Sequence, residues 1–197
     1  MCVAESRGQF HPFFSSKLLE VREGCIEGAT GQYANMCGRD RFRAAVAACM
    51  SRTILRGRMS LDPACVVVSA GCGALLLQLS LLLLDEEDVV LLPTPTYPAL
   101  YNDIQTLAAG RVVDMPMAAD GYRFTRAALE SAAERAGGRA RVLLLLNPSN
   151  PLGVVHSVDE LQLAVVWARE RGMHVIVDEV SAGCAWALRR PACARSA

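Results

Sequence analysis

The sequence contains almost no lysine. Of its 20 basic residues, only Lys17 is a lysine, and the others are arginines. The formal net charge is zero, which argues against a nucleic-acid-binding protein, because such proteins carry a basic surface for the phosphates. Hydrophobic residues make up 52% of the chain, which argues against a disordered one. Lys17 is therefore the only candidate in these residues for a reaction that needs a lysine amine.

The sequence also lacks a hydrophobic run long enough to cross a bilayer. Its most apolar stretch, residues 74–84, is too short for that and predicts a buried core helix. Residues 1–10 contain Glu5 and Arg7 where a signal peptide would need its apolar centre. We therefore expect a cytoplasmic protein without a membrane segment.

The cysteines indicate neither a metal site nor a disulfide framework. The eight cysteines include no Cys-x-x-Cys pair, and no histidine stands at zinc-ligand spacing from them. Without a secretory segment, we expect reduced thiols that pack as small apolar side chains.

Strand-like and helix-like segments alternate from residue 65 onward. The predicted helices are residues 39–56, 72–84, 98–107, 126–136 and 157–171, and the predicted strands are residues 65–69, 89–92, 112–116, 142–146 and 175–177. Ser157 followed by Glu160 forms a capping-box pattern at the start of the last helix. Strands joined by crossover helices predict an α/β fold with a mostly parallel sheet between two helical layers.

Two of the predicted strands end in polar residues. The leucines 143–146 are followed by a loop that holds two prolines and the amides of Asn147 and Asn150, which can donate to a ligand oxygen. The strand around residue 175 ends in Asp178 and Glu179. Ligands of open α/β sheets bind at the carboxyl ends of the strands, so these residues are candidates for a binding site.

A glycine-containing turn joins the first predicted strand to its helix. Gly71 and Gly73 allow close approach of a ligand, and the helix start offers free N–H groups to an anion. The dinucleotide pattern Gly-x-Gly-x-x-Gly fails, because Leu76 replaces its third glycine and no acid follows Leu92. A nucleotide-binding α/β enzyme remains an alternative.

Tyr97 adds an aromatic ring after the strand at 89–92. An anion cradle, a flat ring, two amides and an acid together suit a phosphorylated heteroaromatic compound with a basic ring nitrogen. Pyridoxal 5'-phosphate has these properties, and its ring nitrogen needs an acidic partner.

The ordered motifs resemble those of the class I/II aminotransferases of fold type I, and among them the branch that contains 1-aminocyclopropane-1-carboxylate synthase. The motifs are Tyr33 with Gly38, residues 69–74, residues 95–98, residues 147–153, and Asp178 with Glu179 and Val180. The resemblance implies pyridoxal phosphate as the cofactor and an amino acid, a small molecule, as the substrate. It covers approximately residues 32–186.

The resemblance implies roles for individual residues. Gly71, Cys72 and Gly73 would cradle the phosphate, Tyr97 would stack on the pyridine ring, and Asn150 would bind the phenolic oxygen.

Three further positions complete the implied site. Asp178 would pair with the ring nitrogen. Tyr33 would reach the phosphate in a neighbouring subunit, which implies a homodimer. Ser181 stands where the family usually has a tyrosine and is a weaker candidate for the phenolic oxygen.

The sequence departs from the family pattern in its lysine. The family's Schiff-base lysine lies beyond the residues that follow Asp178, and Lys17 lies in no matching motif. Without that lysine no catalytic residue can be assigned, and we expect these residues to be inactive. Gly73 also stands where a hydroxyl residue is common. A non-catalytic dimerisation or binding module that pairs through the Tyr33 region is therefore a further alternative.

The resemblance also implies the architecture, the large domain of the aspartate aminotransferase type. In that domain the strand order is 3-2-4-5-6-7-1, and this chain would supply strands 1 to 5. We expect the last two strands and the C-terminal small domain to be missing. The expected organisation is an N-terminal arm at residues 1–31, a partial cofactor-binding domain at 32–186, and a non-homologous tail at 187–197.

Overall fold

The computed structural model describes residues 35–106 and 110–182. The chain divides into two compact units, Met1–Gly71 and Cys72–Ala197. Tyr33 and Lys17, as well as the expected arm and tail, lie outside the described residues. The expected domain boundaries stay a prediction.

The first unit is built on helix α2, Asp40–Thr53. Its Arg43 side chain donates to the carbonyl oxygens of Val66 at 2.7 Å and Ala64 at 3.1 Å. These two bonds fasten the 3-10 helix η1, Pro63–Cys65, and the residue that follows it to α2. The predicted helix at 39–56 is thus confirmed, with its end one turn earlier.

The predicted strand at 65–69 is wrong. Residues Pro63–Cys65 form η1 instead, and the Val68 N–H donates to the Cys37 carbonyl at 3.0 Å. A strand exists only where a neighbouring strand completes its ladder of hydrogen bonds. Among the described residues, no strand pairs with this segment. Gly38 permits the contact with Cys37, because its φ is +108° and a Cβ there would lie 3.0 Å from the Val68 Cβ.

The second unit contains a parallel four-stranded sheet in the order β2-β1-β3-β4. The strands are β1 Val89–Thr94, β2 Arg111–Pro116, β3 Ala140–Leu146 and β4 His174–Asp178. The helices are α3 Cys72–Leu83, α4 Ala99–Gln105, α5 Arg126–Arg135 and α6 Val158–Glu170, with the 3-10 helix η2 at Ala118–Asp120. This order equals 3-2-4-5 of the implied family order and confirms the predicted parallel α/β fold.

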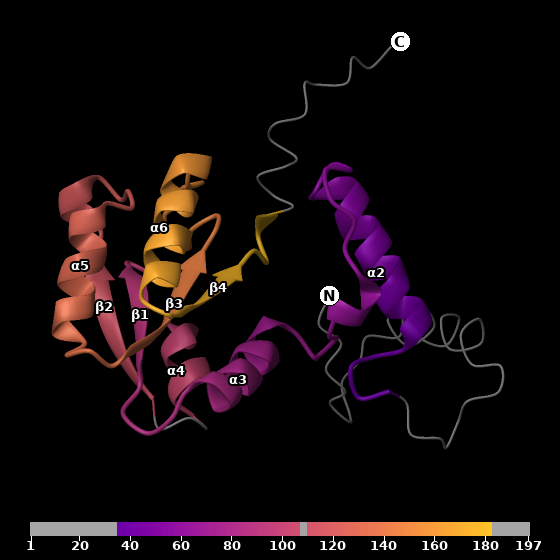
Figure 1. Cartoon of the computed structure of the whole chain (residues 1–197), viewed down its shortest axis with the longest axis horizontal. Helices are drawn as coiled ribbons and strands as arrows, with labels where there is room; N and C mark the ends of the chain where they lie inside the picture. The colour runs from indigo at the N-terminus through magenta and orange to yellow at the C-terminus, as the bar shows by residue number, and fades with distance from the viewer. Residues whose placement is uncertain (1–34, 107–109, 183–197) are drawn as a thin grey trace, which may run out of the picture. The chain divides into compact units, whose positions relative to one another are not determined.

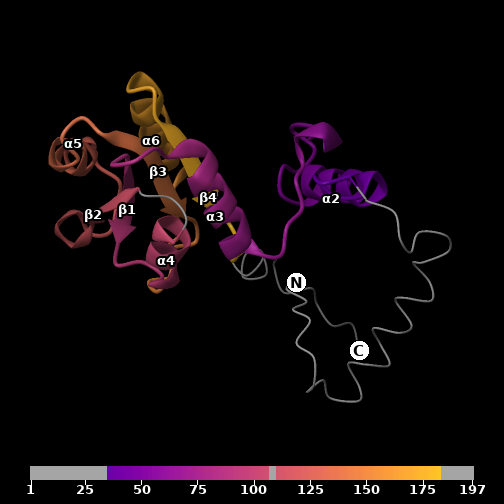
Figure 2. The same cartoon turned by 90° about the horizontal axis from the view of Figure 1, so that it is seen from below.

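Helices cover both faces of the sheet. In Figures 1 and 2, α3 and α4 lie on one side of the strands, and α5 and α6 lie on the other. Successive residues of a strand point to opposite faces, so the leucines of β3 divide between two cores. Leu143 and Leu145 pack with α5 and α6, whereas Leu144 packs with α3 and α4. The run of leucines is therefore the sequence signature of a strand buried on both faces.

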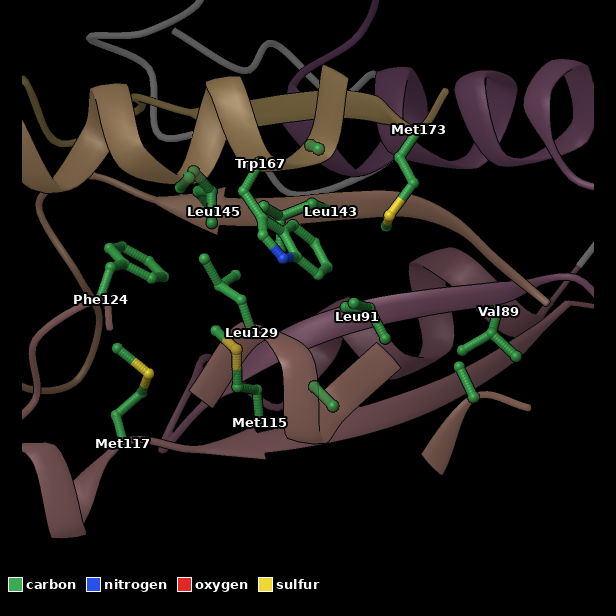
Figure 3. Close-up of a cluster of buried hydrophobic side chains, with 14 residues drawn as sticks. Val89, Leu91, Met115, Met117, Phe124, Leu129, Leu143, Leu145, Trp167 and Met173 are labelled. Atoms are coloured by element: carbon green, nitrogen blue, oxygen red, sulfur yellow. The ribbon is translucent and has the colours of Figure 1, made fainter. Parts of the chain in front are cut away.

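The larger core is centred on Trp167 of α6. Figure 3 shows its indole pointing from the helix towards Leu129, Leu91 and Leu143, and its exposed fraction is 0%. Arg171, one turn later, places its guanidinium carbon 4.4 Å from the centre of the indole ring. This contact covers the outer edge of the core with a cation–π interaction.

Helix α3 differs from the predicted buried core helix. Only Leu76 and Ser80 within the helix are buried, while Leu81 and Leu82 are 59% and 78% exposed. A helix that lies on one face of a sheet buries one stripe of side chains, whatever the composition of the other stripe. No helix in the described part of the chain is long and apolar enough to span a bilayer.

Candidate functional site

The predicted ring-binding residues lie at one edge of the sheet, the edge formed by the carboxyl ends of its strands. Tyr97 follows β1, Asn150 follows β3, and Asp178 ends β4. Strand β3 lies between the other two, and Leu146 pairs with Asp178 in the ladder. The Asn147 N–H continues this ladder by donating to the Asp178 carbonyl at 3.0 Å. Open α/β sheets bind ligands outside the carboxyl ends of their strands, where these three residues lie.

Local hydrogen bonds hold the loop that carries Asn150. The side-chain oxygen of Asn147 accepts from the His156 N–H at 3.1 Å, which closes the loop at its base. Ser149 donates its N–H to Val154 at 2.8 Å, and Gly153, with φ +67°, donates to Ser149 at 2.8 Å. Asn147 is therefore a residue that fastens the loop, and Asn150 is the amide that the loop exposes.

The other ring-binding candidates are accessible to solvent. Tyr97 is 47% exposed. Asp178 is half-buried, and its Oδ1 accepts from the Val180 N–H at 2.9 Å, which orients the carboxylate locally. Ser181 is half-buried in the turn that follows.

The amino terminus of α3 points towards the same edge of the sheet. Leu84, directly after the helix, lies against Gly110 at the amino end of β2, since a Cβ on Gly110 would come within 2.8 Å of a Leu84 methyl. The 12 residues of α3 are about 18 Å long, which matches the length of a strand. Cys72 and Gly73 therefore start the helix near the carboxyl ends. Gly71, with φ +91°, is the last residue of the first unit.

An acidic side chain lies beside the predicted phosphate cradle. A Cβ built on Gly73 would be 3.2 Å and 3.3 Å from the two carboxylate oxygens of Asp103 on α4. This residue was not among the candidates predicted from sequence. The only sequence signal is its position three residues after the buried Leu100 and one residue before the buried Ile104, which puts it beside the buried stripe of α4 and says nothing about Gly73.

A small cavity lies next to the Asn150 loop. Its wall includes Thr94, Tyr122, Ser149 and His156, and the volume open to the centre of a water molecule is about 20 Å³, enough for one water. The Ser149 Oγ and the His156 Nδ1 are buried without a hydrogen-bond partner within the described structure. Burial lowers the pKa of His156, with Glu160 opposing and Arg123 adding to the effect, so the imidazole is neutral at pH 7.

A family model for class I and II aminotransferases matches residues 16–194. The chain belongs to this family. It is 34% identical over 154 residues to 1-aminocyclopropane-1-carboxylate synthase 4 of Oryza sativa subsp. japonica, covering 76% of this chain and 31% of the relative. It is 34% identical over 181 residues to synthase 3 of the same plant, covering 90% and 38%. The chain thus spans about a third of the length of these curated relatives.

Solved aminotransferase structures have the same fold. The N-succinyldiaminopimelate aminotransferase from Mycobacterium tuberculosis superimposes with a TM-score of 0.70 at 30% identity, covering 84% of this chain and 42% of that one. Substrate-bound BacF from Bacillus subtilis superimposes with a TM-score of 0.69 at 26% identity, covering 81% and 39%. These structures confirm the predicted three-layer architecture of the aspartate aminotransferase type.

Members of the class I and II aminotransferase family depend on pyridoxal phosphate. The described residues suit the two ends of this cofactor unequally. Tyr97, Asn150 and Asp178 provide a ring face, an amide and an acid at one edge, as a protonated pyridine ring requires. At α3, by contrast, Gly73 offers no hydroxyl, and the Asp103 carboxylate lies beside Gly73, where it adds negative charge next to the predicted phosphate cradle. The phosphate end therefore does not fit as well as the ring end.

Proposed function

We propose that this chain carries the cofactor-facing part of a pyridoxal-phosphate-dependent enzyme that acts on amino acids. The reaction class is amino-acid transamination or elimination chemistry like that of the 1-aminocyclopropane-1-carboxylate synthases. The observation that carries the proposal is the common edge of β1, β3 and β4, from which Tyr97, Asn150 and Asp178 emerge in a chain that belongs to the family.

The proposed residues bind and orient the cofactor ring. The negative charge of the Asp178 carboxylate favours a protonated ring nitrogen, and the Val180 N–H orients this carboxylate at the tip of β4. Tyr97 offers its ring face for stacking, and Asn150 donates its amide to the phenolic oxygen. When bound, the cofactor supplies an electron sink for chemistry at an amino acid.

The acid at the tip of β4 gives the first test. Replacing Asp178 by asparagine removes the charged partner of the ring nitrogen, and a charge-assisted hydrogen bond contributes more than a neutral one. We expect the affinity for pyridoxal phosphate and for pyridoxal to fall about tenfold each, measured by isothermal titration calorimetry. Glu179→Gln is the matched control, because this adjacent carboxylate is exposed and has no proposed role.

The outcome of this titration decides the proposal. Unchanged affinity of the Asp178→Asn protein for both compounds would contradict the assignment of the acid. If the unsubstituted protein bound neither compound, the proposed cofactor site itself would be wrong.

A polypeptide of these 197 residues is proposed to have no turnover. The only lysine is Lys17, which lies in no family motif, and a Schiff base to the cofactor needs a lysine amine. We expect borohydride reduction in the presence of pyridoxal phosphate to leave no pyridoxyl group on lysine, as read by mass spectrometry of tryptic peptides. Lys17→Arg is the control, and an adduct at Lys17 that this substitution removes would contradict the prediction.

A non-catalytic role remains a second proposal. The chain is 30% identical over 176 residues to a mouse protein named "Probable inactive 1-aminocyclopropane-1-carboxylate synthase-like protein 2", covering 84% of this chain. Homodimerisation through the Tyr33 region, and a cytoplasmic location, stay predictions. Gel filtration tests the first, since a monomer would contradict it.

A further inference from the structure

We propose that Asp103 is a built-in anion at the amino terminus of α3 that lowers the affinity of this site for the phosphate group of the cofactor. The inference rests on the proposed function, because it concerns the same site. Tyr97, Asn150 and Asp178 would bind the ring end of the ligand, whereas Asp103 would act on its phosphate end.

The space beside Gly73 shows how the acid reaches the helix start. A Cβ on Gly73 would lie 3.2 Å and 3.3 Å from the two Asp103 oxygens and 3.5 Å from the carbon between them. Contacts between 3.0 and 3.4 Å are tight, so a side chain at position 73 would require the carboxylate to shift by a few tenths of an ångström. Gly73 accommodates the carboxylate in its present position and itself offers no side-chain donor to the cradle.

Helix α4 holds Asp103 in this position. Leu100, three residues before it, and Ile104, the next residue, are each 1% exposed and pack in one core with residues of α3. Two residues earlier, the Tyr101 hydroxyl donates to the Asp114 carboxylate of β2 at 2.5 Å. Burial and the bond to Asp114 raise the pKa of Tyr101 to about 12, so this donor stays protonated at neutral pH. The packing of α4 therefore fixes the backbone of Asp103 beside the start of α3.

The charge of Asp103 acts against a phosphate group. A carboxylate is favourable at a helix amino terminus, because the unpaired N–H groups there carry partial positive charge. A phosphate that approaches the same groups meets a like charge at short range. No hydrogen bond or ion pair to the Asp103 carboxylate is found within residues 35–106 and 110–182.

The test is the affinity of two ligands that differ only in the phosphate. We expect Asp103→Asn to raise the affinity for pyridoxal phosphate about tenfold and to leave the affinity for pyridoxal unchanged, both measured by isothermal titration calorimetry. Asp103→Ala should also raise the affinity for pyridoxal phosphate. Because alanine has no amide, this second variant shows whether the asparagine amide itself contributes to the effect. Glu86→Gln is the matched control, because it removes one negative charge from the exposed turn before β1, at the opposite edge of the sheet. Circular dichroism establishes that each variant keeps its helices.

The possible results separate this inference from the proposed function. Equal affinity of the unsubstituted protein and both Asp103 variants for pyridoxal phosphate would overturn the inference and leave the ring site intact. An equal rise with the Glu86→Gln control would also overturn it, because the effect would then be one of net charge. Absence of binding of either ligand by every variant would contradict the proposed function, and the inference would fail with it.

Discussion

Replacing Trp167 by alanine is expected to lower the free energy of unfolding by about 3–5 kcal/mol. The indole is fully buried among Leu91, Leu129 and Leu143, and thus joins both helices of one layer to two central strands. Its removal leaves a cavity that no neighbouring side chain is long enough to fill, and it also removes the ring beneath the Arg171 guanidinium. Small folded units have little stability in reserve, so the variant should be largely unfolded at 37 °C (about physiological temperature).

Urea titration followed by circular dichroism measures this loss. Trp167→Phe keeps an aromatic ring in the cavity and should lose much less stability. Val158→Ala, at a position of α6 that is 77% exposed, should change it by less than about 0.5 kcal/mol. A loss below about 1 kcal/mol for Trp167→Ala would show that the core does not depend on this residue.

Replacing Glu160 by alanine is expected to lower the free energy of unfolding by about 2–3 kcal/mol at pH 7. Its carboxylate accepts from the Ser157 N–H at 2.9 Å, which completes the capping box of α6. The same group accepts from the Phe124 N–H at 3.3 Å and lies 3.5 Å from Arg123. One side chain therefore caps a helix and also fixes the chain that leads into α5, and alanine leaves both N–H groups without a partner.

The effect of Glu160 should depend on pH. Burial raises its pKa, but the hydrogen bonds from Ser157 and Phe124 and the charge of Arg123 outweigh burial, so the pKa lies below its ordinary value of 4.5. A carboxyl group with a depressed folded-state pKa stabilises above its unfolded pKa and loses this contribution as the pH falls through the folded value. The difference between the unsubstituted protein and Glu160→Ala should therefore be full at pH 7 and smaller once the pH is well below 4.5.

Unfolding free energies at several pH values check this prediction. Glu160→Gln retains a capping acceptor without charge, so its difference from alanine should not vary over the acidic range. Asp159→Asn controls for a carboxylate that is exposed in the same turn. A difference for Glu160→Ala that stays constant down to strong acid would contradict the assigned interactions.

Several parts of the fold could be predicted because their signals are local. The leucines 143–146 form a strand of which both faces are buried, and Ser157 with Glu160 caps the helix that follows. The predicted strand at 65–69 failed for the opposite reason. Its valines suit a strand, but a strand depends on a partner elsewhere in the chain, and Val68 bonds to Cys37 instead.

The candidate site also contains parts that could be predicted from the sequence and parts that could not. Tyr97, Asn150 and Asp178 could be predicted to lie at one edge, because each follows a strand and parallel strands end together. Asn147 and Asn150 look equivalent in the sequence, yet His156 binds only the first. No sequence signal placed Asp103 beside Gly73, since an acid on the flank of a helix is an ordinary feature.

By itself, the sequence determined the strands and helices of the sheet unit, the ring-binding candidates and the shortage of lysine, because these depend on residue order and on contacts within a few positions. Only the tertiary structure decided that α3 buries one stripe rather than its whole surface, that Glu160 reaches Phe124, and that the Asp103 carboxylate lies beside Gly73. Each of these depends on how α3, α4 and α6 pack on the sheet, and packing joins residues that are far apart in the chain.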